Sequence, residues 1–311
     1  MDYSIIFPVY NEEENIGELY TRTKKVLEGM KSSYEIIFIN DGSTDKTALL
    51  LHALHEKDAT VKIVNFSRNF GHQNAVTAGL KYSTGTAVAI LDADIQDPPE
   101  ILPDFFAKLD EGYDVVYAIR KNRKEGLLKR MAYSLFYRFL SRIAEIDMPL
   151  DSGDFCVMKR RVVDAVNMLP ERNRFIRGLR SWVGYKQVGL PYERSERSGG
   201  ESKYTLSKLF KLAFDGIFSF SYFPLQLMFT IGTVSLVVSS IGVLVAMYFR
   251  FFTPFYKQVP GFATTIILVM FIGGLQLFTL GLLGEYLRRV YDEIKNRPSF
   301  IVESTLGLEK K

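Results

Sequence analysis

The chain has 311 residues, of which 47% are hydrophobic and 24% are charged, proportions that exclude a disordered or low-complexity chain. Its 39 basic and 35 acidic residues give a net charge of +4, which is too small to predict a nucleic-acid partner. Its single cysteine, Cys156, excludes both an internal disulfide framework and a zinc site built from cysteines.

The N-terminal part of the chain alternates short apolar runs with longer amphipathic stretches. Runs rich in Ile, Val, Phe and Tyr, which suit strands buried on both faces of a sheet, cover residues 3–9, 34–39, 61–66, 86–91 and 113–119. Between them lie segments of helical pattern, such as residues 15–28 and 44–56. This alternation predicts an α/β domain with a mainly parallel sheet and helices on both faces.

Four of the predicted strands are followed by polar clusters, at residues 8–12, 40–45, 67–69 and 92–97. Sheets of this kind bind ligands at the carboxyl ends of their strands, so the four clusters are expected to converge on one cleft. Each cluster taken alone also fits an ordinary helix cap or turn. The chain has no GxGxxG after its first strand and no GxxxxGK[ST], which argues against a dinucleotide or P-loop site.

Asp92 and Asp94 lie two residues apart at a predicted strand end. Side chains at this spacing in an extended segment point the same way, so both carboxylates can face one divalent cation. Two carboxylates with waters and phosphate oxygens suit Mg²⁺ or Mn²⁺, and Gln96 could add a third protein oxygen. The alternative is an acidic turn that caps the helix starting near Pro98, which explains Asp97 better than Asp92 or Asp94.

The segments PVYNEEENI, INDGSTDKT, SRNFGHQNA and LDADIQDPPE, in this order, resemble the nucleotide-sugar-binding half of a GT-A (Rossmann-like) glycosyltransferase of family 2. The later segments DSGDF and RSGGESKY, followed by two apolar segments, narrow the resemblance to polyprenyl-phosphate glycosyltransferases, relatives of dolichyl-phosphate mannose synthase. Within this family the chain looks most similar to the bactoprenol glucosyltransferases. The resemblance implies transfer of one hexose, with glucose from UDP-glucose preferred, onto undecaprenyl phosphate for later glycan modification in the cell envelope.

The resemblance also implies roles for positions around the donor. The nucleotide pocket would be lined by Pro8, Tyr10 and Glu12, and Asp41 would contact the uracil or ribose. Asp92 would lie near the ribose or the metal, and Asp94 and Gln96 would bind the cation.

A second group of residues is implied for the lipid phosphate. Arg120, Arg130 and Ser134 would lie where this phosphate arrives, and Arg197 and Lys203, in a loop with two glycines, would close on the phosphates. For Arg130 the solvated face of a helix over residues 127–143 remains an equal alternative.

The resemblance places a candidate base, or a carboxylate that orients the acceptor, at Asp154. Asp151 is the second choice and equally fits a turn. A single displacement would invert the sugar, so that an α-linked donor gives a β-linked lipid phosphate. Cys156 stands where relatives often have arginine, so one phosphate ligand is expected to be missing.

Charge is absent from residues 216–249 and 258–284. Within them, residues 225–249 and 262–283 are each long enough to span a membrane. Basic residues gather before the first segment and after the second, which predicts that the catalytic domain and both termini are cytoplasmic at the inner (cell) membrane. Residues 205–221 have an amphipathic pattern that fits a helix in the membrane interface, or a surface helix packed on the domain.

These patterns predict four regions: a catalytic domain (1–204), an amphipathic juxtamembrane helix (205–221), a two-helix transmembrane domain (222–287) and a cytoplasmic C-terminal tail (288–311). Glycines in the apolar segments permit close helix contact, and the resemblance implies a homo-tetramer. Other donors remain open, namely GDP-mannose, UDP-N-acetylhexosamine and UDP-aminoarabinose. A processive polysaccharide synthase and a non-catalytic membrane scaffold are less favoured alternatives, because the only tryptophan does not fit an acceptor motif of such synthases and the acidic clusters are intact.

Overall fold

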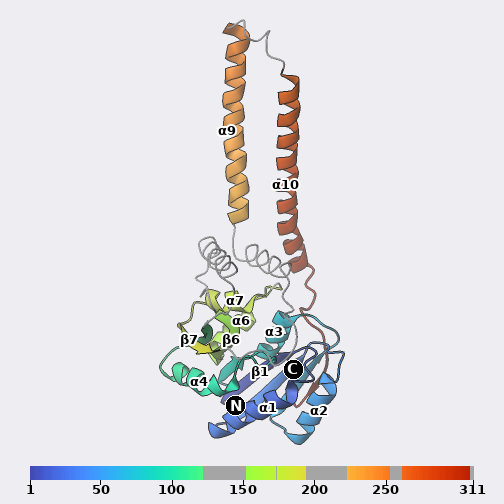
Figure 1. The fold of residues 1–311 in the computed structure, drawn as a ribbon, viewed down its shortest axis with the longest axis vertical. Helices are drawn as coiled ribbons and strands as arrows, with labels where there is room; N and C mark the ends of the chain where they lie inside the picture. The colour runs from blue at the N-terminus through green and yellow to red at the C-terminus, as the bar shows by residue number, and fades with distance from the viewer. Residues whose placement is uncertain (122–151, 173, 194–222, 253–260, 309–311) are drawn as a thin grey trace. The chain divides into compact units, whose positions relative to one another are not determined.

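The computed structural model describes residues 1–121, 152–172, 174–193, 223–252 and 261–308 (Figure 1). The chain forms two compact units. The first contains the described residues up to Glu193 together with those from Arg297 onward, and the second contains the two long C-terminal helices. Each unit is therefore considered by itself.

The first unit is built on an eight-stranded sheet in the order β7-β5-β6-β4-β1-β2-β3-β8. Its strands are β1 (Tyr3–Val9), β2 (Tyr34–Asn40), β3 (Val61–Phe66), β4 (Ala87–Ile90), β5 (Val115–Lys121), β6 (Ser152–Lys159), β7 (Gln187–Glu193) and β8 (Val302–Leu306). Strands β1 to β4 are mutually parallel, while β6 runs antiparallel to β4 and β5, and β8 antiparallel to β3. The prediction of a mainly parallel α/β sheet is confirmed.

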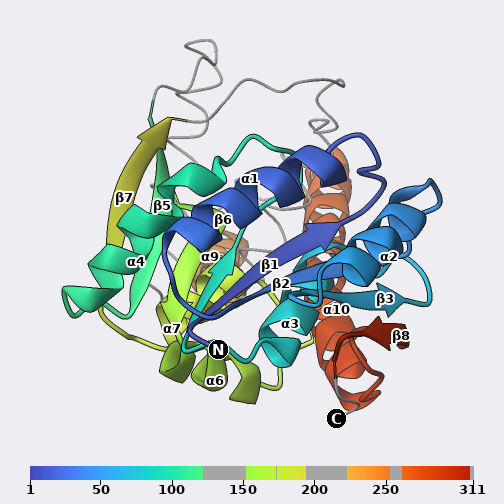
Figure 2. The ribbon, with the colours of Figure 1, turned by 90° about the horizontal axis from the view of Figure 1, so that it is seen from below.

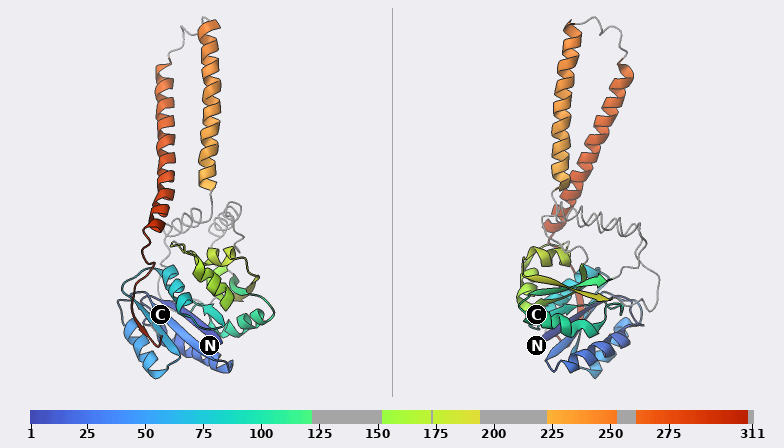
Figure 3. Two further views of the ribbon diagram at one scale, coloured as in Figure 1. Left: turned by 180° about the vertical axis from the view of Figure 1, so that it is seen from behind. Right: turned by 60° about the vertical axis from the view of Figure 1, so that its left-hand side comes forward.

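Helices cover both faces of this sheet (Figure 2, Figure 3). One face carries α1 (Ile16–Gly29), α2 (Thr47–Lys57), the short 3₁₀ helix η1 (Pro99–Ile101) and α4 (Leu102–Asp110). The other carries α3 (His72–Tyr82), α6 (Arg160–Met168) and α7 (Ile176–Trp182). The central strands are thereby enclosed on both sides, as continuous apolar runs require.

The core of the unit combines helix residues, such as Leu19 and Phe105, with strand residues that are apolar at consecutive positions. Ile5, Ile6 and Phe7 of β1 are all fully buried. The rings of Phe7 and Phe38 stack with centroids 5.4 Å apart, which joins β1 to β2 on one face. Side chains on both faces of the strands are thus removed from water, and this burial is the main driving force for the fold.

The C-terminal strand β8 was not predicted. Residues 302–306 fall in the region expected to be a tail, but they pair with β3 at the edge of the sheet, where Figure 2 shows the two strands side by side. The register shifts between Asn65 and Phe66, so that Glu303 is the extra residue of a β-bulge. The chain therefore returns to the first unit after its last long helix.

The second unit contains α9 (Phe223–Phe252) and α10 (Phe262–Ile294). Pro224–Gly242 and Leu268–Ile294 are long and apolar enough to cross a membrane. The prediction of two long apolar helices is confirmed, and α10 extends beyond the predicted segment to Ile294. The helices predicted over residues 127–143 and 205–221 lie outside the described residues.

Candidate active site

The loops that follow β1 and β2 are joined by hydrogen bonds at the carboxyl end of the sheet. Asn11, which has a left-handed φ of 55°, accepts a hydrogen bond at Oδ1 from the Thr44 amide at 2.8 Å. The Asn11 amide donates to Ser43 Oγ at 3.0 Å, and the Glu12 amide donates to Thr47 Oγ1 at 2.9 Å. Two of the predicted polar clusters, at residues 8–12 and 40–45, are therefore joined into one hydrogen-bonded pair of loops.

The residues predicted to line the nucleotide pocket lie in or beside these loops. Pro8 is buried in β1, beyond the last β1 residue that pairs with β4, so its missing N–H does not interrupt that ladder. Tyr10 is 42% exposed. Glu12 accepts a hydrogen bond from Asn15 Nδ2 at 2.6 Å. Their contacts with a nucleotide stay a prediction.

Asp41 holds the neighbouring loop between β3 and α3 (residues 67–71, the β3–α3 loop). Its Oδ1 accepts from the Phe70 amide at 2.6 Å and its Oδ2 accepts from the Gly71 amide at 2.9 Å. Burial raises the pKa of Asp41 above its usual value, while the two amide donors act in the opposite direction. The structure thus gives Asp41 a loop-supporting role in addition to the predicted contact with the uracil or ribose, which stays a prediction.

Gly42 allows the β2–α2 and β3–α3 loops to approach closely. Its φ is +68°, and a Cβ there would lie 2.4 Å from the backbone carbonyl carbon of Arg68. We expect Gly42→Ala to destabilise the first unit by more than about 1 kcal/mol, because both the backbone conformation and the space exclude a side chain. A lower melting temperature in detergent would show this effect.

Gly17 in α1 provides the matched control, since nothing lies within 4 Å of a Cβ at that position. We expect Gly17→Ala to leave the melting temperature unchanged or to raise it, because alanine is the better helix former. Equal melting temperatures for the Gly42 and Gly17 variants would contradict the close-approach argument.

Four charged side chains meet where β4 and β6 run side by side. The antiparallel register pairs Ile90 with Cys156, and this brings Asp92, just beyond β4, near Asp154 in β6. His72, the first residue of α3, points its Nε2 at both carboxylates, 3.5 Å from Asp154 Oδ2 and 3.8 Å from Asp92 Oδ1. Arg177 of α7 completes the cluster, with Nε 2.7 Å from Asp154 Oδ1. We call these four residues the central cluster.

The charged groups of the central cluster shift the pKa values of Asp154 and His72. Burial would raise the pKa of Asp154, but the charge of Arg177 and hydrogen bonds from His72 and Arg177 outweigh it and hold this pKa well below its usual value. Partial burial acts to lower the pKa of His72, but the Asp154 hydrogen bond and the charge of Asp92 raise it to about 9. At neutral pH the site therefore contains an ionised Asp154 held between two cations.

Asp92 is in a different electrostatic situation. Burial raises its pKa to about 6; His72 opposes this rise, while the Asp97, Asp154 and Asp94 carboxylates add to it. A divalent cation would relieve such crowding of carboxylates. No group of three or more His, Cys, Asp or Glu side chains is arranged to hold a metal ion within the described part of the chain. The available ligands are oxygen atoms, which suits a cation that takes its remaining ligands from phosphate and water.

The chain after Asp92 turns instead of continuing as a strand. The Gln96 amide donates to Asp94 Oδ1 at 3.3 Å, and Ile95 between them has a left-handed φ of 61°. Such a conformation is strained for a β-branched residue and is typical of functional loops. The expectation that the spacing of Asp92 and Asp94 follows an extended strand is therefore wrong, because β4 ends at Ile90. The metal role of Asp92 and Asp94 stays a prediction.

The structure describes only part of the predicted acceptor site. Arg120 belongs to β5, where its backbone is paired with Tyr192 of β7. Outside the described residues lie Arg130, Ser134, Asp151, Arg197 and Lys203. Their predicted roles stay predictions.

Sequence reasoning missed two members of the central cluster, His72 and Arg177. His72 lies in the segment SRNFGHQNA, which was recognised as a motif, so its position after β3 was the available signal. Arg177 lies in a segment with no recognised motif, and only the packing of α7 on β6 reveals it.

Cys156 also has an arginine neighbour. Burial raises the pKa of its thiol, and the nearby charge and hydrogen bond of Arg180 act against this rise. Arg180, which is only 1% exposed, also lies over the Tyr117 ring at 5.4 Å from the centroid. A guanidinium from α7 therefore lies beside the position where an arginine was expected to be missing.

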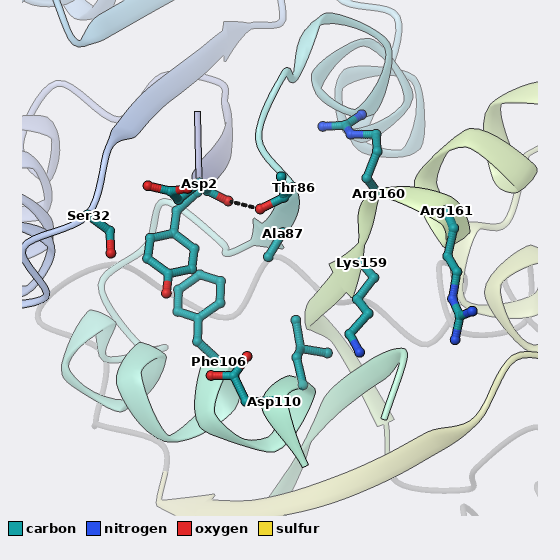
Figure 4. Close-up of a pocket in the computed structure, with 11 residues that line it drawn as sticks. Asp2, Ser32, Thr86, Ala87, Phe106, Asp110, Lys159, Arg160 and Arg161 are labelled. Atoms are coloured by element: carbon teal, nitrogen blue, oxygen red, sulfur yellow. Dashed lines mark hydrogen bonds between the residues drawn. The ribbon is translucent and has the colours of Figure 1, made fainter. Parts of the chain in front are cut away.

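A hollow of about 540 Å³ lies at the end of the sheet opposite the polar loops (Figure 4). It is lined by Tyr3 and Ala87, where β1 and β4 begin, and by Phe106 of α4 and Lys159 of β6. Because the amino ends of these strands are remote from the polar loops, this hollow is separate from the central cluster.

Comparison with known proteins agrees with the family resemblance found in the sequence. Residues 4–166 match the family described as glycosyl transferase family 2. An uncharacterized glycosyltransferase of Bacillus subtilis is 45% identical, covering 100% of this chain and 96% of the relative. A prophage-derived bactoprenol glucosyl transferase of Shigella flexneri is 40% identical, covering 98% of each chain.

Solved structures with similar folds include the glucosyl-3-phosphoglycerate synthase of Mycobacterium tuberculosis in complex with Mn²⁺, UDP-glucose and phosphoglyceric acid. It is 18% identical, with a TM-score of 0.47, and the match covers 70% of this chain and 77% of that chain.

Proposed function

Because the chain belongs to glycosyl transferase family 2, we propose that it moves a single hexose, glucose from UDP-glucose, onto the phosphate of undecaprenyl phosphate. The observation that carries this proposal is the 40% identity to a bactoprenol glucosyl transferase over 98% of both chains. This match extends beyond the catalytic unit into α9 and α10. A processive synthase or a scaffold has no comparable support.

The chemistry of the site is compatible with a single displacement. An oxygen of the lipid phosphate attacks the anomeric carbon of the sugar, and the bond from that carbon to the nucleoside diphosphate breaks. The sugar inverts, so an α-linked donor gives a β-linked product. A phosphate is largely ionised at neutral pH, so the reaction needs orientation of the acceptor more than removal of a proton.

Asp154 is better suited to orientation than to proton transfer. A carboxylate with a pKa well below its usual value is a poor base at neutral pH. Arg177 and His72 fix it from two directions, which is the arrangement expected of a group that positions a reactant. We therefore assign Asp154 the role of orienting the acceptor, with Arg120, Arg130 and Ser134 as the proposed ligands of its phosphate.

The residues around Asp92 fit a divalent cation. Asp94, Gln96 and Asp92 would hold Mg²⁺ or Mn²⁺, and the cation would stabilise the departing diphosphate. On the nucleotide we place Pro8, Tyr10, Glu12 and Asp41, and on the phosphates Arg197 and Lys203. We expect Asp94→Ala to abolish metal-stimulated transfer without lowering the melting temperature. Turnover retained at the wild-type level would remove the metal role from Asp94.

Strand β8 supports the proposed topology. Residues before α9 and after α10 belong to the same sheet, so two crossings of a membrane would return the chain to the side on which it started. Arg288, Arg289, Lys295 and Arg297 near the end of α10 favour the cytoplasmic side. We therefore place both termini in the cytoplasm at the inner membrane. A homo-tetramer stays a prediction.

The function is tested with purified protein in detergent, undecaprenyl phosphate and Mg²⁺. UDP-glucose, UDP-galactose, UDP-N-acetylglucosamine and GDP-mannose are offered in parallel, and the glycolipid is identified by its mass. We expect product from UDP-glucose. Product from another donor alone would overturn the sugar but keep the reaction, and no lipid product from a folded protein would overturn the proposal.

A further inference from the structure

The C-terminal segment contacts the β3–α3 loop directly. The Ser67 amide donates to the Ile301 carbonyl at 3.1 Å. The ring of Phe300 stacks on Phe66, with centroids 4.9 Å apart and an interplanar angle of 13°. Phe66 in turn meets the edge of Phe70 at 5.8 Å. Residues 300 and 301 therefore pack against one end of the loop, while Asp41 binds its other end.

A second connection runs from β8 along the carboxyl ends of β3, β2 and β1. Asn65 Nδ2 of β3 donates to Ser304 Oγ of β8 at 3.0 Å, and Asn40 Nδ2 of β2 donates to Asn65 Oδ1 at 2.9 Å. The Ser43 amide donates to Asn40 Oδ1 at 3.0 Å, and the Asn11 amide donates to Ser43 Oγ at 3.0 Å. An unbroken chain of hydrogen bonds thus joins β8 to the loop after β1.

These contacts matter because the β3–α3 loop has no secondary structure of its own. Ordering such a segment costs conformational entropy, and only contacts with its surroundings offset this cost. The loop leads directly into His72 of the central cluster and borders Gly42. A loop that is ordered before the substrate arrives lowers the cost of binding.

We propose that Phe300, Ile301 and Ser304 form a positioning element of the donor site. Phe300 and Ser304 hold the β3–α3 loop and the loop after β1 in the conformation that receives the nucleoside diphosphate. The inference rests on the proposed function for the identity of the ligand, but the support of the loop is a property of the protein alone. Neither Phe300 nor Ser304 is assigned a contact with substrate.

The test uses the full chain in detergent, with Phe300→Ala and Ser304→Ala, and with Phe300→Tyr as the conservative variant. Glu303→Gln is the control, because Glu303 lies on β8 beside Ser304 but its side chain is exposed and takes part in none of these contacts. UDP affinity is measured by titration calorimetry, and amide hydrogen exchange is measured for a peptide covering residues 67–74. KM for undecaprenyl phosphate is measured separately.

We expect Phe300→Ala to weaken UDP binding about fivefold or more and Ser304→Ala about twofold to threefold, with faster exchange in residues 67–74. Phe300→Tyr and Glu303→Gln should behave as wild type, and KM for the lipid should not change. Unchanged exchange and UDP affinity in Phe300→Ala would overturn the inference, as would an equal loss for both substrates.

The two proposals fail in distinguishable ways. A folded wild-type protein that does not bind UDP would count against UDP as the donor nucleotide. The exchange measurement would then still decide whether Phe300 and Ser304 order the loop. If Phe300→Ala does not fold, Ser304→Ala provides the same comparison with a smaller change.

Discussion

Replacing Asp154 by asparagine is expected to lower kcat by about 10³-fold, within the range found when a group that stabilises or orients the reacting centre is removed. The amide keeps the shape of the side chain but not its charge. Arg177 and His72 would then face a neutral group instead of the carboxylate that both of them contact. Turnover is measured with radiolabelled donor at saturating lipid and Mg²⁺, together with KM for each substrate.

Because Asp154 is proposed to orient the acceptor, KM for the donor should stay within about threefold of wild type while kcat falls. Asp164→Asn on α6 is the matched control, since the Asp164 side chain is 58% exposed and its ion pair with Arg160 is 3.7 Å long. The control should leave both constants unchanged. An Asp154→Asn enzyme within tenfold of wild type would contradict the assignment.

Most of the fold could be predicted from the sequence because its strands are continuous apolar runs. Residues 3–9 and 61–66 were predicted with the bounds that the structure shows. Strand β8 could not be predicted in this way. Its sequence, VESTL, has only two apolar residues, and it lies at the edge of the sheet, where the burial that produces an apolar run is incomplete. Its place in the sheet depends on pairing with β3, which is remote in sequence.

The site was predictable only where a motif marked it. Asp92 and Asp154 were identified from their segments, and the antiparallel register of β4 and β6 accounts for their proximity. Arg177 has no motif, and it enters the site because α7 packs beside β6. The geometry of Asp94 was predicted wrongly, because a period-two rule holds only while the backbone is extended, and residues 93 and 94 lie in a turn.

The largest effect on stability is expected at Glu35 in β2, remote from the central cluster. Its side chain is fully buried and accepts hydrogen bonds from Ser4, Lys62 and Thr84, with the Thr84 amide at 2.6 Å and Thr84 Oγ1 at 2.9 Å. These partners belong to β1, β3 and the segment before β4. This one carboxylate of β2 therefore links three other segments, namely β1, β3 and the segment before β4.

Glu35→Ala should destabilise the first unit by about 3 to 5 kcal/mol, because removing one member of a buried ion pair leaves the other charge and its donors without compensation. Glu35→Gln should cost less, since its amide oxygen can still accept from Thr84. The only tryptophan, Trp182, lies in α7 of this unit, so its fluorescence can follow urea unfolding in detergent. Glu56→Ala is the control, because the Glu56 side chain is 68% exposed, and it should shift stability by less than about 0.5 kcal/mol.

The pH dependence distinguishes loss of the charge from loss of packing. Burial would raise the pKa of Glu35, but hydrogen bonds from Lys62, Ser4 and Thr84 outweigh it and hold the folded-state pKa below the usual value. A lowered folded-state pKa adds stability above the unfolded-state value of about 4.3 and loses it as the pH falls through the folded-state pKa. The advantage of wild type over Glu35→Gln should therefore be constant near neutrality and shrink below about pH 4. An advantage that is the same at pH 7 and pH 3.5 would mean that the carboxylate stabilises the sheet by its shape and not by its charge.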